Sequence, residues 1–181
     1  RANMGSEFGA ELKRAGYDGL VITGGAEEPT WLVIQDDQVS LRSGQALWGL
    51  DALTTIEEAQ RQLGQAARTM AIGPAGERLS RIATIQVASS SAAGQGGFGA
   101  VMGAKRLKAV SVMGSGHVAA AHPEELARLV HDTERELRAN RPVPDCTRLN
   151  ERLQADRGGR ARPYACTANC PTPCNLYYQD M

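Results

Sequence analysis

The sequence predicts an α+β protein: a mainly antiparallel β-sheet domain over residues 1–116, followed by the beginning of an α-helical domain over residues 117–181. Two observations support this prediction. Up to about residue 113, short apolar runs alternate with brief helical patterns. A much longer helical pattern begins at residue 123, after a glycine and serine break. The length of 181 residues allows one ordinary domain and the start of another.

Short strand patterns dominate the first part of the chain. Most are bounded by glycine, proline or aspartate, which favour turns. The two aspartates at residues 36–37 separate two strands closely enough for a tight hairpin. Residues 73–76 contain proline and glycine and are expected to form a turn. The expected strands are residues 19–23, 31–34, 39–42, 70–72, 82–87 and 107–113.

Two short helices are expected among these strands. The first covers about residues 7–15, and Gly16 suits the position just past its end. The second begins at Thr54 or Thr55, because each has a glutamate three residues later that completes a capping box. Gly64 is expected to end this second helix.

A longer helix opens the second part of the chain. Pro123 suits its first turn, and Glu124 and Glu125 suit the positive end of the helix dipole. Apolar residues recur at helical spacing, with charged residues on the other face. Residues 141–163, which contain several prolines and glycines, are expected to be loop. The apolar stripe comprises Leu126, Leu129, Val130 and Leu137.

Charge and hydropathy exclude several classes of protein. Lysine and arginine total 20, as do aspartate and glutamate, so no net field attracts nucleic acid or an anionic membrane. No apolar run approaches the roughly 18–20 residues of a membrane helix. The first residues lack the basic and apolar regions of a secretory signal peptide. We therefore expect a cytoplasmic protein with no nucleic-acid or membrane partner.

Residues 94–99 match the dinucleotide-binding pattern G-x-G-x-x-G. A nucleotide site also requires a helix after the glycines and an acidic residue about 20 positions later. We expect neither, because a strand pattern begins at Leu107 and no acidic residue lies between Gly94 and Ala121. Two interpretations remain: a segment whose backbone approaches a ligand, or a surface loop or sheet corner that needs positive φ angles.

Three cysteines cluster near the end of the chain, at Cys166, Cys170 and Cys174. Closely spaced thiolates can bind an iron–sulfur cluster, which takes four such ligands. They can also bind zinc, with Cys146 as the fourth ligand. Disulfides or free thiols are the third possibility, and a reducing compartment disfavours disulfides.

Three longer motifs together resemble the aldehyde:ferredoxin oxidoreductase family of tungsten and molybdenum enzymes. Residues 2–19 resemble the family block "AN-x-GG" followed by "FG-x-ELK-x-AGYD". Residues 72–77 resemble "IGPAGE", and residues 92–105 resemble "AAGRGG-x-GAVMGSK". The motifs occur in the family's order and cover the chain from residue 2 to about residue 114.

The resemblance implies that residues 1–116 belong to a pterin-binding domain that lacks its first part. In this family the domain lies under a bis-pterin cofactor carrying tungsten or molybdenum, and magnesium bridges the two pterin phosphates. Backbone carbonyls bind the magnesium, at positions that correspond to Asn3 and Ala92. The family commonly has arginines at the positions of Ser91 and Gln95, so the contacts with the phosphates differ here. The expected cofactor-binding residues are Asn3, Gly5, Ser91, Ala92, Ala93, Gly94 and Gln95.

The resemblance also favours a [4Fe–4S] cluster on Cys166, Cys170 and Cys174. Family members carry C-x2-C-x3-C near the start of the helical region and a fourth cysteine much later. The first gap is one residue longer here, and no cysteine follows Cys174 in this chain.

By resemblance, the intact protein oxidises aldehydes to carboxylic acids and passes electrons to ferredoxin or a similar carrier. A related branch reduces aromatic thioesters. We expect no catalytic residue in this piece, which looks incomplete at both ends and inactive alone, and the intact protein could form a homo-oligomer. Two alternatives remain: a non-catalytic binding module stabilised by zinc, and a degenerate remnant of the family.

Overall fold

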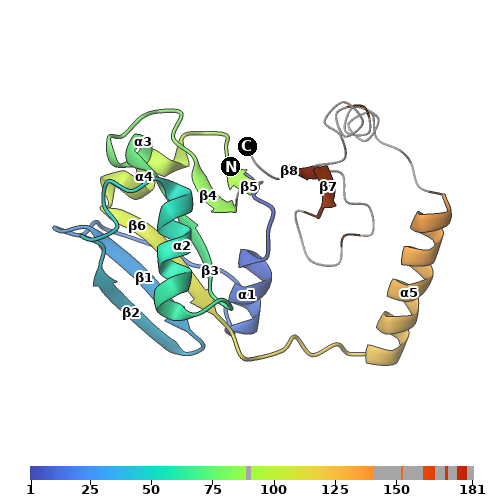
Figure 1. Ribbon diagram of the computed structural model, residues 1–181. Coiled ribbons are helices and arrows are strands. Elements are labelled where there is room, and N and C mark those ends of the chain that lie inside the picture. Colours follow the sequence, from blue (N-terminus) through green and yellow to red (C-terminus); the bar gives the residue numbers. More distant parts are fainter. Residues whose placement is uncertain (89–90, 141–151, 153–160, 166–169, 171–174, 179–181) are drawn as a thin grey trace. The chain divides into compact units, whose positions relative to one another are not determined.

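The computed structural model describes residues 1–88, 91–140, 152, 161–165, 170 and 175–178. The chain divides into two compact units, Arg1–Val118 and Ala119–Met181. A six-stranded sheet forms the centre of the first unit (Figure 1). Its order is β2-β1-β6-β3-β4-β5, and every pairing is antiparallel except that of β1 with β6. The predicted fold class, α+β with a mainly antiparallel sheet, is confirmed.

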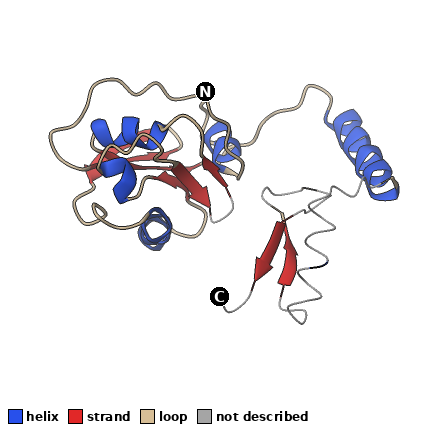
Figure 2. Cartoon of the chain, turned by 90° about the horizontal axis from the view of Figure 1, so that it is seen from above, coloured by secondary structure: helices blue, strands red, loops and turns tan. Residues whose placement is uncertain are grey.

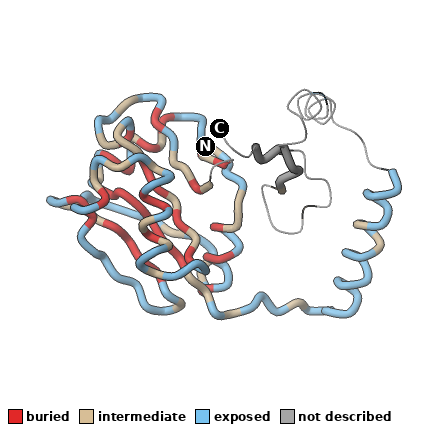
Figure 3. Tube along the Cα trace, viewed as in Figure 1, coloured by how far each residue is buried: buried red, intermediate tan, exposed pale blue. Residues whose placement is uncertain are grey.

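Helices cover both faces of this sheet, as Figure 2 shows from above. α1 (Phe8–Arg14) and α4 (Phe98–Ala104) pack on one face through Phe8, Leu12 and Met102. α2 (Ala52–Leu63) packs on the other face through Ile56 and Ala59. The buried residues therefore concentrate along the central strands (Figure 3).

The strands of the first unit run close to their expected positions, and β6 matches its predicted bounds. Because β6 lies at the centre of the sheet with helices on both faces, its residues are buried on both sides. The strands are β1 (Thr30–Gln35), β2 (Gln38–Ser43), β3 (Arg68–Ala71), β4 (Ile85–Ala88), β5 (Ser91–Ala93) and β6 (Leu107–Met113).

The predicted hairpin is confirmed. β1 and β2 pair from Gln35 and Gln38 outward, so residues 36 and 37 make the turn. Asp36 has a φ of +51°, a conformation that aspartate tolerates better than most residues. Asp36 also accepts a hydrogen bond of 2.7 Å from the backbone N–H of Ser115, and this bond lowers the pKa of the carboxyl.

The strand expected at residues 19–23 does not form. This segment has the apolar composition of a strand, but it crosses a face of the sheet instead of pairing at an edge. Leu20 packs against the core, whereas Val21 is 93% exposed. Composition alone cannot show whether a neighbouring strand is available.

The second helix begins earlier than its predicted cap. Asp51 is the capping residue, because its carboxylate accepts hydrogen bonds from the N–H groups of Leu53 (2.9 Å) and Thr54 (3.0 Å). Thr55 lies inside the helix, and its hydroxyl donates to the carbonyl of Asp51 at 2.7 Å. The capping box at Thr54 or Thr55 is therefore wrong, while the predicted end at Gly64, with a φ of +101°, is confirmed.

The turn expected at residues 73–76 is instead a single helical turn, α3 (Pro74–Glu77). Pro74 occupies its first turn, where a missing N–H costs nothing. The predicted strand at residues 82–87 begins later, at Ile85.

In the second unit, α5 (Pro123–Ala139) begins at the predicted proline. Leu126, Leu129, Val130 and Leu137 line one side of it and are 38–52% exposed. β7 (Ala161–Tyr164) and β8 (Asn175–Tyr178) form an antiparallel pair, where the sequence predicted only loop up to residue 163. Among the described helices, none is both long enough and apolar enough to cross a membrane.

Candidate cofactor site

Two segments that the sequence singled out lie against each other in the first unit. One is the first motif, residues 2–6, and the other is β5 with the loop that follows it (Figure 1). A Cβ atom placed on Gly5 would be only 2.9 Å from the hydroxyl oxygen of Ser91. A Cβ atom at residue 5 would therefore force the Ser91 hydroxyl to move, while its distance of 3.8 Å from the Ser91 Cβ is an ordinary contact.

The first motif is fixed at its far end. Phe8 is buried in the core, and the Glu7 carboxylate forms an ion pair of 2.6 Å with Arg68 of β3. Ser6, between these anchors and Gly5, has a φ of +78°. The family pattern "AN-x-GG" has glycine at this position, and glycine adopts a left-handed conformation most readily. Asn3 lies before the contact and is exposed.

β5 is the edge strand of the sheet on this side. Its pairing with β4 places Ala92 opposite Gln86 and Ala93 opposite Ile85. An edge strand leaves one row of backbone N–H and C=O groups without a partner strand. Such carbonyls are suitable ligands for a hard cation such as magnesium.

Ser91 is buried, with 8% of its surface exposed. Among the residues that the structure describes, none forms a hydrogen bond with its hydroxyl. Most buried hydroxyl groups have a partner, so an unpaired one needs an explanation. Its position beside Gly5, at the contact between two predicted cofactor-binding segments, is consistent with a bound polar group.

The glycine segment ends in a short helix that the sequence analysis did not expect. Gly96 and Gly97 have φ angles of +90° and +66°, and Gly97 immediately precedes α4. The chain nevertheless lacks a dinucleotide fold. β5 and β6 are not neighbours in the sheet, whereas the dinucleotide fold needs parallel strands around its helix.

Several glycines of the family motifs serve packing between helices. A Cβ atom on Gly103 of α4 would lie 1.9 Å from the carbonyl oxygen of Gly76 in α3, and one on Gly76 would lie 2.9 Å from the carbonyl oxygen of Gly99. A Cβ atom on Gly97 would lie 2.1 Å from the carbonyl oxygen of Arg81. Of the glycines that follow β5, Gly94 alone has open space around it, and Gln95 beside it is exposed.

A buried ion pair between Lys108 and Glu77 links β6 to α3, and the sequence did not predict it. Lys108 of β6 is fully buried and donates to the Glu77 carboxylate at 2.6 Å and to the carbonyl of Leu50 at 2.7 Å. Glu77, 6% exposed, also accepts the N–H of Gly49 at 3.0 Å. A lysine inside an otherwise apolar strand was the signal that could have revealed the pair.

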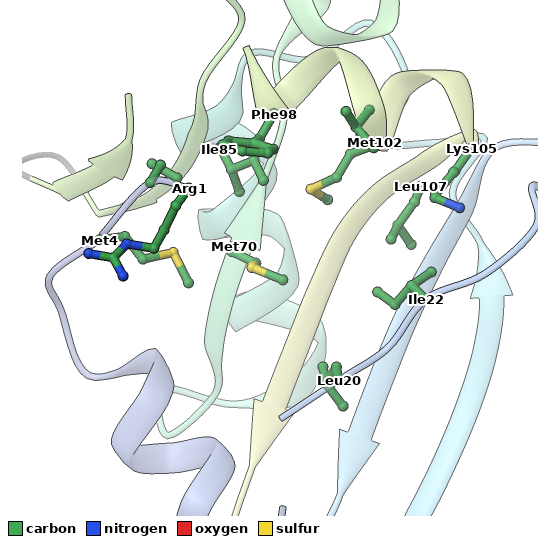
Figure 4. A pocket seen from close by; sticks show the side chains of 13 residues that line it. Arg1, Met4, Leu20, Ile22, Met70, Ile85, Phe98, Met102, Lys105 and Leu107 are labelled. Carbon is green, nitrogen blue, oxygen red and sulfur yellow. The ribbon is translucent and has the colours of Figure 1, made fainter. Parts of the chain in front are cut away.

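A cavity of about 430 Å³ opens between the first motif, the crossing segment near residues 20–22, and α4 (Figure 4). Its lining is mostly apolar, with Arg1 and Lys105 as the charged residues. Lys105 donates to the carbonyl of Gly24 at 2.6 Å. The lining residues are Arg1, Ala2, Met4, Leu20, Ile22, Met70, Ile85, Ala93, Phe98, Val101, Met102, Lys105 and Leu107.

The cysteine motif falls largely outside the described residues. Cys170 is half-buried, while Cys166, Cys174 and Cys146 belong to the part of the chain that the structure does not describe. Within the described part, no three cysteine, histidine, aspartate or glutamate side chains come close enough to hold a metal ion.

Comparisons with known proteins identify the family to which this α+β domain belongs. A family model described as "Aldehyde ferredoxin oxidoreductase, N-terminal domain" matches residues 1–114. The chain therefore belongs to the aldehyde ferredoxin oxidoreductase family. The resemblance inferred from the three motifs is confirmed.

Curated relatives include tungsten-containing aldehyde ferredoxin oxidoreductases of Pyrococcus furiosus (41% identical) and Thermococcus kodakarensis (42% identical). Each alignment covers 78% of this chain and 24% of the relative. A solved structure, "Active site complex BamBC of Benzoyl Coenzyme A reductase in complex with 1,5 Dienoyl-CoA", matches with a TM-score of 0.72 and 39% identity. That match covers 80% of this chain and 22% of the other, so the chain spans about a quarter of the length of its relatives.

The residues present fit a phosphate-bearing cofactor with a bridging cation. The edge of β5 offers backbone carbonyls, Gly94 leaves room for close approach, and the buried Ser91 hydroxyl has no hydrogen-bond partner among the described residues. Ser91 and Gln95 stand where the family commonly has arginines. Binding of a phosphate would therefore depend more on backbone N–H groups and on neutral side chains.

Proposed function

We propose that the intact protein is a tungsten- or molybdenum-pterin oxidoreductase that oxidises aldehydes to carboxylic acids. The observation that carries the proposal is the contact between Gly5 and Ser91, which brings the first motif and the glycine segment of this family together. The tungsten-containing relatives support the choice of metal. When bound, the metal–pterin supplies the two-electron redox chemistry, and the protein supplies placement and insulation.

Each cofactor-binding residue has a role that its position permits. The carbonyls of Asn3 and Ala92 would bind magnesium between the pterin phosphates. Gly5 allows the two segments to lie close together, and Ala93 is buried in β5. Ser91, Gly94 and Gln95 would face the phosphates, with the Ser91 hydroxyl and the backbone N–H groups as donors.

We further propose that Cys166, Cys170 and Cys174 bind a [4Fe–4S] cluster, with the fourth ligand elsewhere in the intact protein. The cluster would pass electrons one at a time to ferredoxin or a similar carrier. Zinc bound with Cys146 remains the alternative to test. Both the iron–sulfur cluster and the zinc site need thiolates, which a reducing cytoplasm maintains.

The test is metal and activity analysis of the full-length protein, produced without oxygen. We expect tungsten or molybdenum, iron and acid-labile sulfide, and aldehyde-dependent reduction of ferredoxin. Zinc on the cysteines with no tungsten, molybdenum or pterin would overturn the proposal in favour of a non-catalytic module. Failure to bind any metal would favour a degenerate remnant. Residues 1–181 alone should show no aldehyde oxidation, because a quarter of such an enzyme cannot enclose the cofactor.

A second candidate function is reduction of an aromatic acyl thioester. The solved structure from a benzoyl coenzyme A reductase is 39% identical to this chain and favours that possibility. The two functions differ in substrate. Parallel assays with aldehydes and with benzoyl thioesters therefore separate them.

A further inference from the structure

We propose that residues 114–116 form a rigid strap docked onto the first unit, and that the flexible joint between the two units begins only after Gly116. The segment reads Gly114-Ser115-Gly116, a composition typical of a flexible linker. In the structure, however, each of its three backbone N–H groups has a hydrogen-bond acceptor within the first unit. The inference is independent of the proposed function.

Two carboxylates hold the first part of the strap, and both come from elements beside the end of β6 (Figure 1). Glu11 of α1, which is 8% exposed, accepts the N–H of Gly114 at 2.8 Å. Asp36, in the turn between β1 and β2, accepts the N–H of Ser115 at 2.7 Å. Hydrogen bonds to a charged acceptor are stronger than those between neutral groups, so these two contacts fix the chain as it leaves the sheet.

Arg14, the last residue of α1, holds the end of the strap. Its carbonyl accepts the N–H of Gly116 at 3.2 Å, and its guanidinium donates to the carbonyl of Gly116 at 3.1 Å. The same guanidinium lies 3.4 Å from the Glu11 carboxylate, so the groups that hold the strap also hold one another. Residues 117–121 make no hydrogen bond with any described residue, and the division between the two units follows Val118.

The two glycines of the strap allow close approach to α1. Neither has a positive φ angle, so the backbone conformation does not require glycine at either position. A Cβ atom on Gly114 would lie 2.3 Å from the backbone nitrogen of Ala15. One on Gly116 would lie 2.5 Å from the carbonyl oxygen of Arg14. A side chain at either position would therefore force the strap away from the helix.

Amide hydrogen exchange and backbone NMR relaxation of the 181-residue chain test where the joint begins. Residues 114–116 should exchange at least about tenfold more slowly than an unstructured chain, with order parameters close to the value of about 0.85 for rigid backbone. Residues 117–121 should exchange almost as fast as an unstructured chain and have lower order parameters. Equal mobility of the two segments would contradict the proposal, and so would equal protection of both.

Asp36→Gly tests the role of a carboxylate in holding the strap. Asp36 has a φ of +51°, which glycine adopts readily, so the variant removes the acceptor and keeps the turn. The Ser115 amide should then exchange about tenfold faster or more, the usual effect of losing a hydrogen bond to a charged group, while the amides of β6 stay protected. Asp37→Gly is the matched control, because the Asp37 carboxylate makes no hydrogen bond with the strap. An unchanged Ser115 rate in Asp36→Gly, or an equal rise in both variants, would overturn the proposal.

Gly116→Ala tests the close approach. The added Cβ should displace the end of the strap, so the Gly116→Ala protein should lose protection at residues 115–116 by about tenfold or more. His117→Ala is the control, because His117 is exposed and should leave the strap protected. A flexible linker would accept alanine at residue 116 without any change in exchange, and that result would contradict the proposal. If Gly116→Ala does not fold, the wild-type protein and the Asp36→Gly variant still decide the question.

Discussion

At the scale of single residues, Ser6 holds a backbone conformation that glycine adopts far more readily. Its φ of +78° lies within the first motif, one residue from the contact with Ser91. A side chain in this region costs about 1 kcal/mol relative to glycine. Because the neighbouring Glu7–Arg68 ion pair and buried Phe8 fix the chain, Ser6 cannot relax to a more favourable angle.

Ser6→Gly should therefore raise the free energy of unfolding only slightly, by up to about 0.5 kcal/mol, after allowing for the greater freedom of glycine in the unfolded chain. Urea denaturation followed by circular dichroism measures the change. Ser40→Gly in the extended strand β2 is the control, and it should lower stability. A destabilised Ser6→Gly would show that the serine side chain makes a contribution the backbone angle does not reveal.

The buried Lys108–Glu77 pair is the other residue-scale feature with a clear energetic consequence. Both groups have additional hydrogen-bond partners, Leu50 for the lysine and Gly49 for the glutamate. Removing one charge leaves the other buried without compensation, which costs about 3–5 kcal/mol. Lys108→Met should thus lower the free energy of unfolding by about that amount.

The double variant Lys108→Met/Glu77→Met should recover much of this loss, because it leaves no unpaired buried charge. Equilibrium urea unfolding of the wild type, both single variants and the double variant gives the coupling energy directly. A coupling energy near zero would mean that the two side chains stabilise the fold independently.

At the scale of elements, the α3–α4 contact depends on glycine to an unusual degree. Gly103→Ala would place a Cβ 1.9 Å from the carbonyl oxygen of Gly76, a distance that backbone atoms cannot accommodate without moving. The helices must separate, and we expect a loss of at least about 3 kcal/mol in unfolding free energy. Thermal and urea unfolding both measure this loss of stability.

Gly9→Ala in α1 is the matched control. A Cβ there meets nothing within 4 Å, and alanine favours a helix over glycine by about 1 kcal/mol. This variant should be stabilised. If both glycine substitutions destabilised the protein equally, the close approach of α3 and α4 would not be the cause.

The elements also show what the sequence could and could not predict. β6 was predicted with its observed bounds, because a central strand must be apolar on both faces and that pattern is local. The strand at residues 19–23 failed because strand formation needs a partner edge, which lies elsewhere in the chain. The helix cap went to Asp51 instead of Thr54 because both are good capping residues, and the sequence alone does not show at which of them the helical backbone begins.

The candidate site was also predictable from the sequence only in part. The motifs identified both segments, but only the three-dimensional structure shows that Gly5 lies against Ser91 and that Ser91 is buried. The glycines at 76, 99 and 103 carry the family resemblance as strongly as Gly94, yet they allow close packing against the backbone of neighbouring segments. A sequence pattern alone cannot separate glycines that face a ligand from glycines that face another helix.

At the scale of the whole molecule, the stability of the chain should reside in the first unit. Among the described residues, the core clusters are built from residues no later than Val112, and α5 contributes no buried residue. A protein truncated after Val118 should therefore unfold cooperatively, with a free energy within about 0.5 kcal/mol of that of the same transition in the 181-residue chain.

Near-ultraviolet circular dichroism of the buried Trp31, followed through urea unfolding of both proteins, measures that transition. The m-value gives a second comparison, because it follows the surface exposed on unfolding and should be the same if the first unit unfolds alone. A truncated protein with a markedly lower midpoint or m-value would show that residues 119–181 add to the folded core. An unchanged transition would make residues 1–118 a defined unit for studying the Gly5–Ser91 contact apart from the cysteine region.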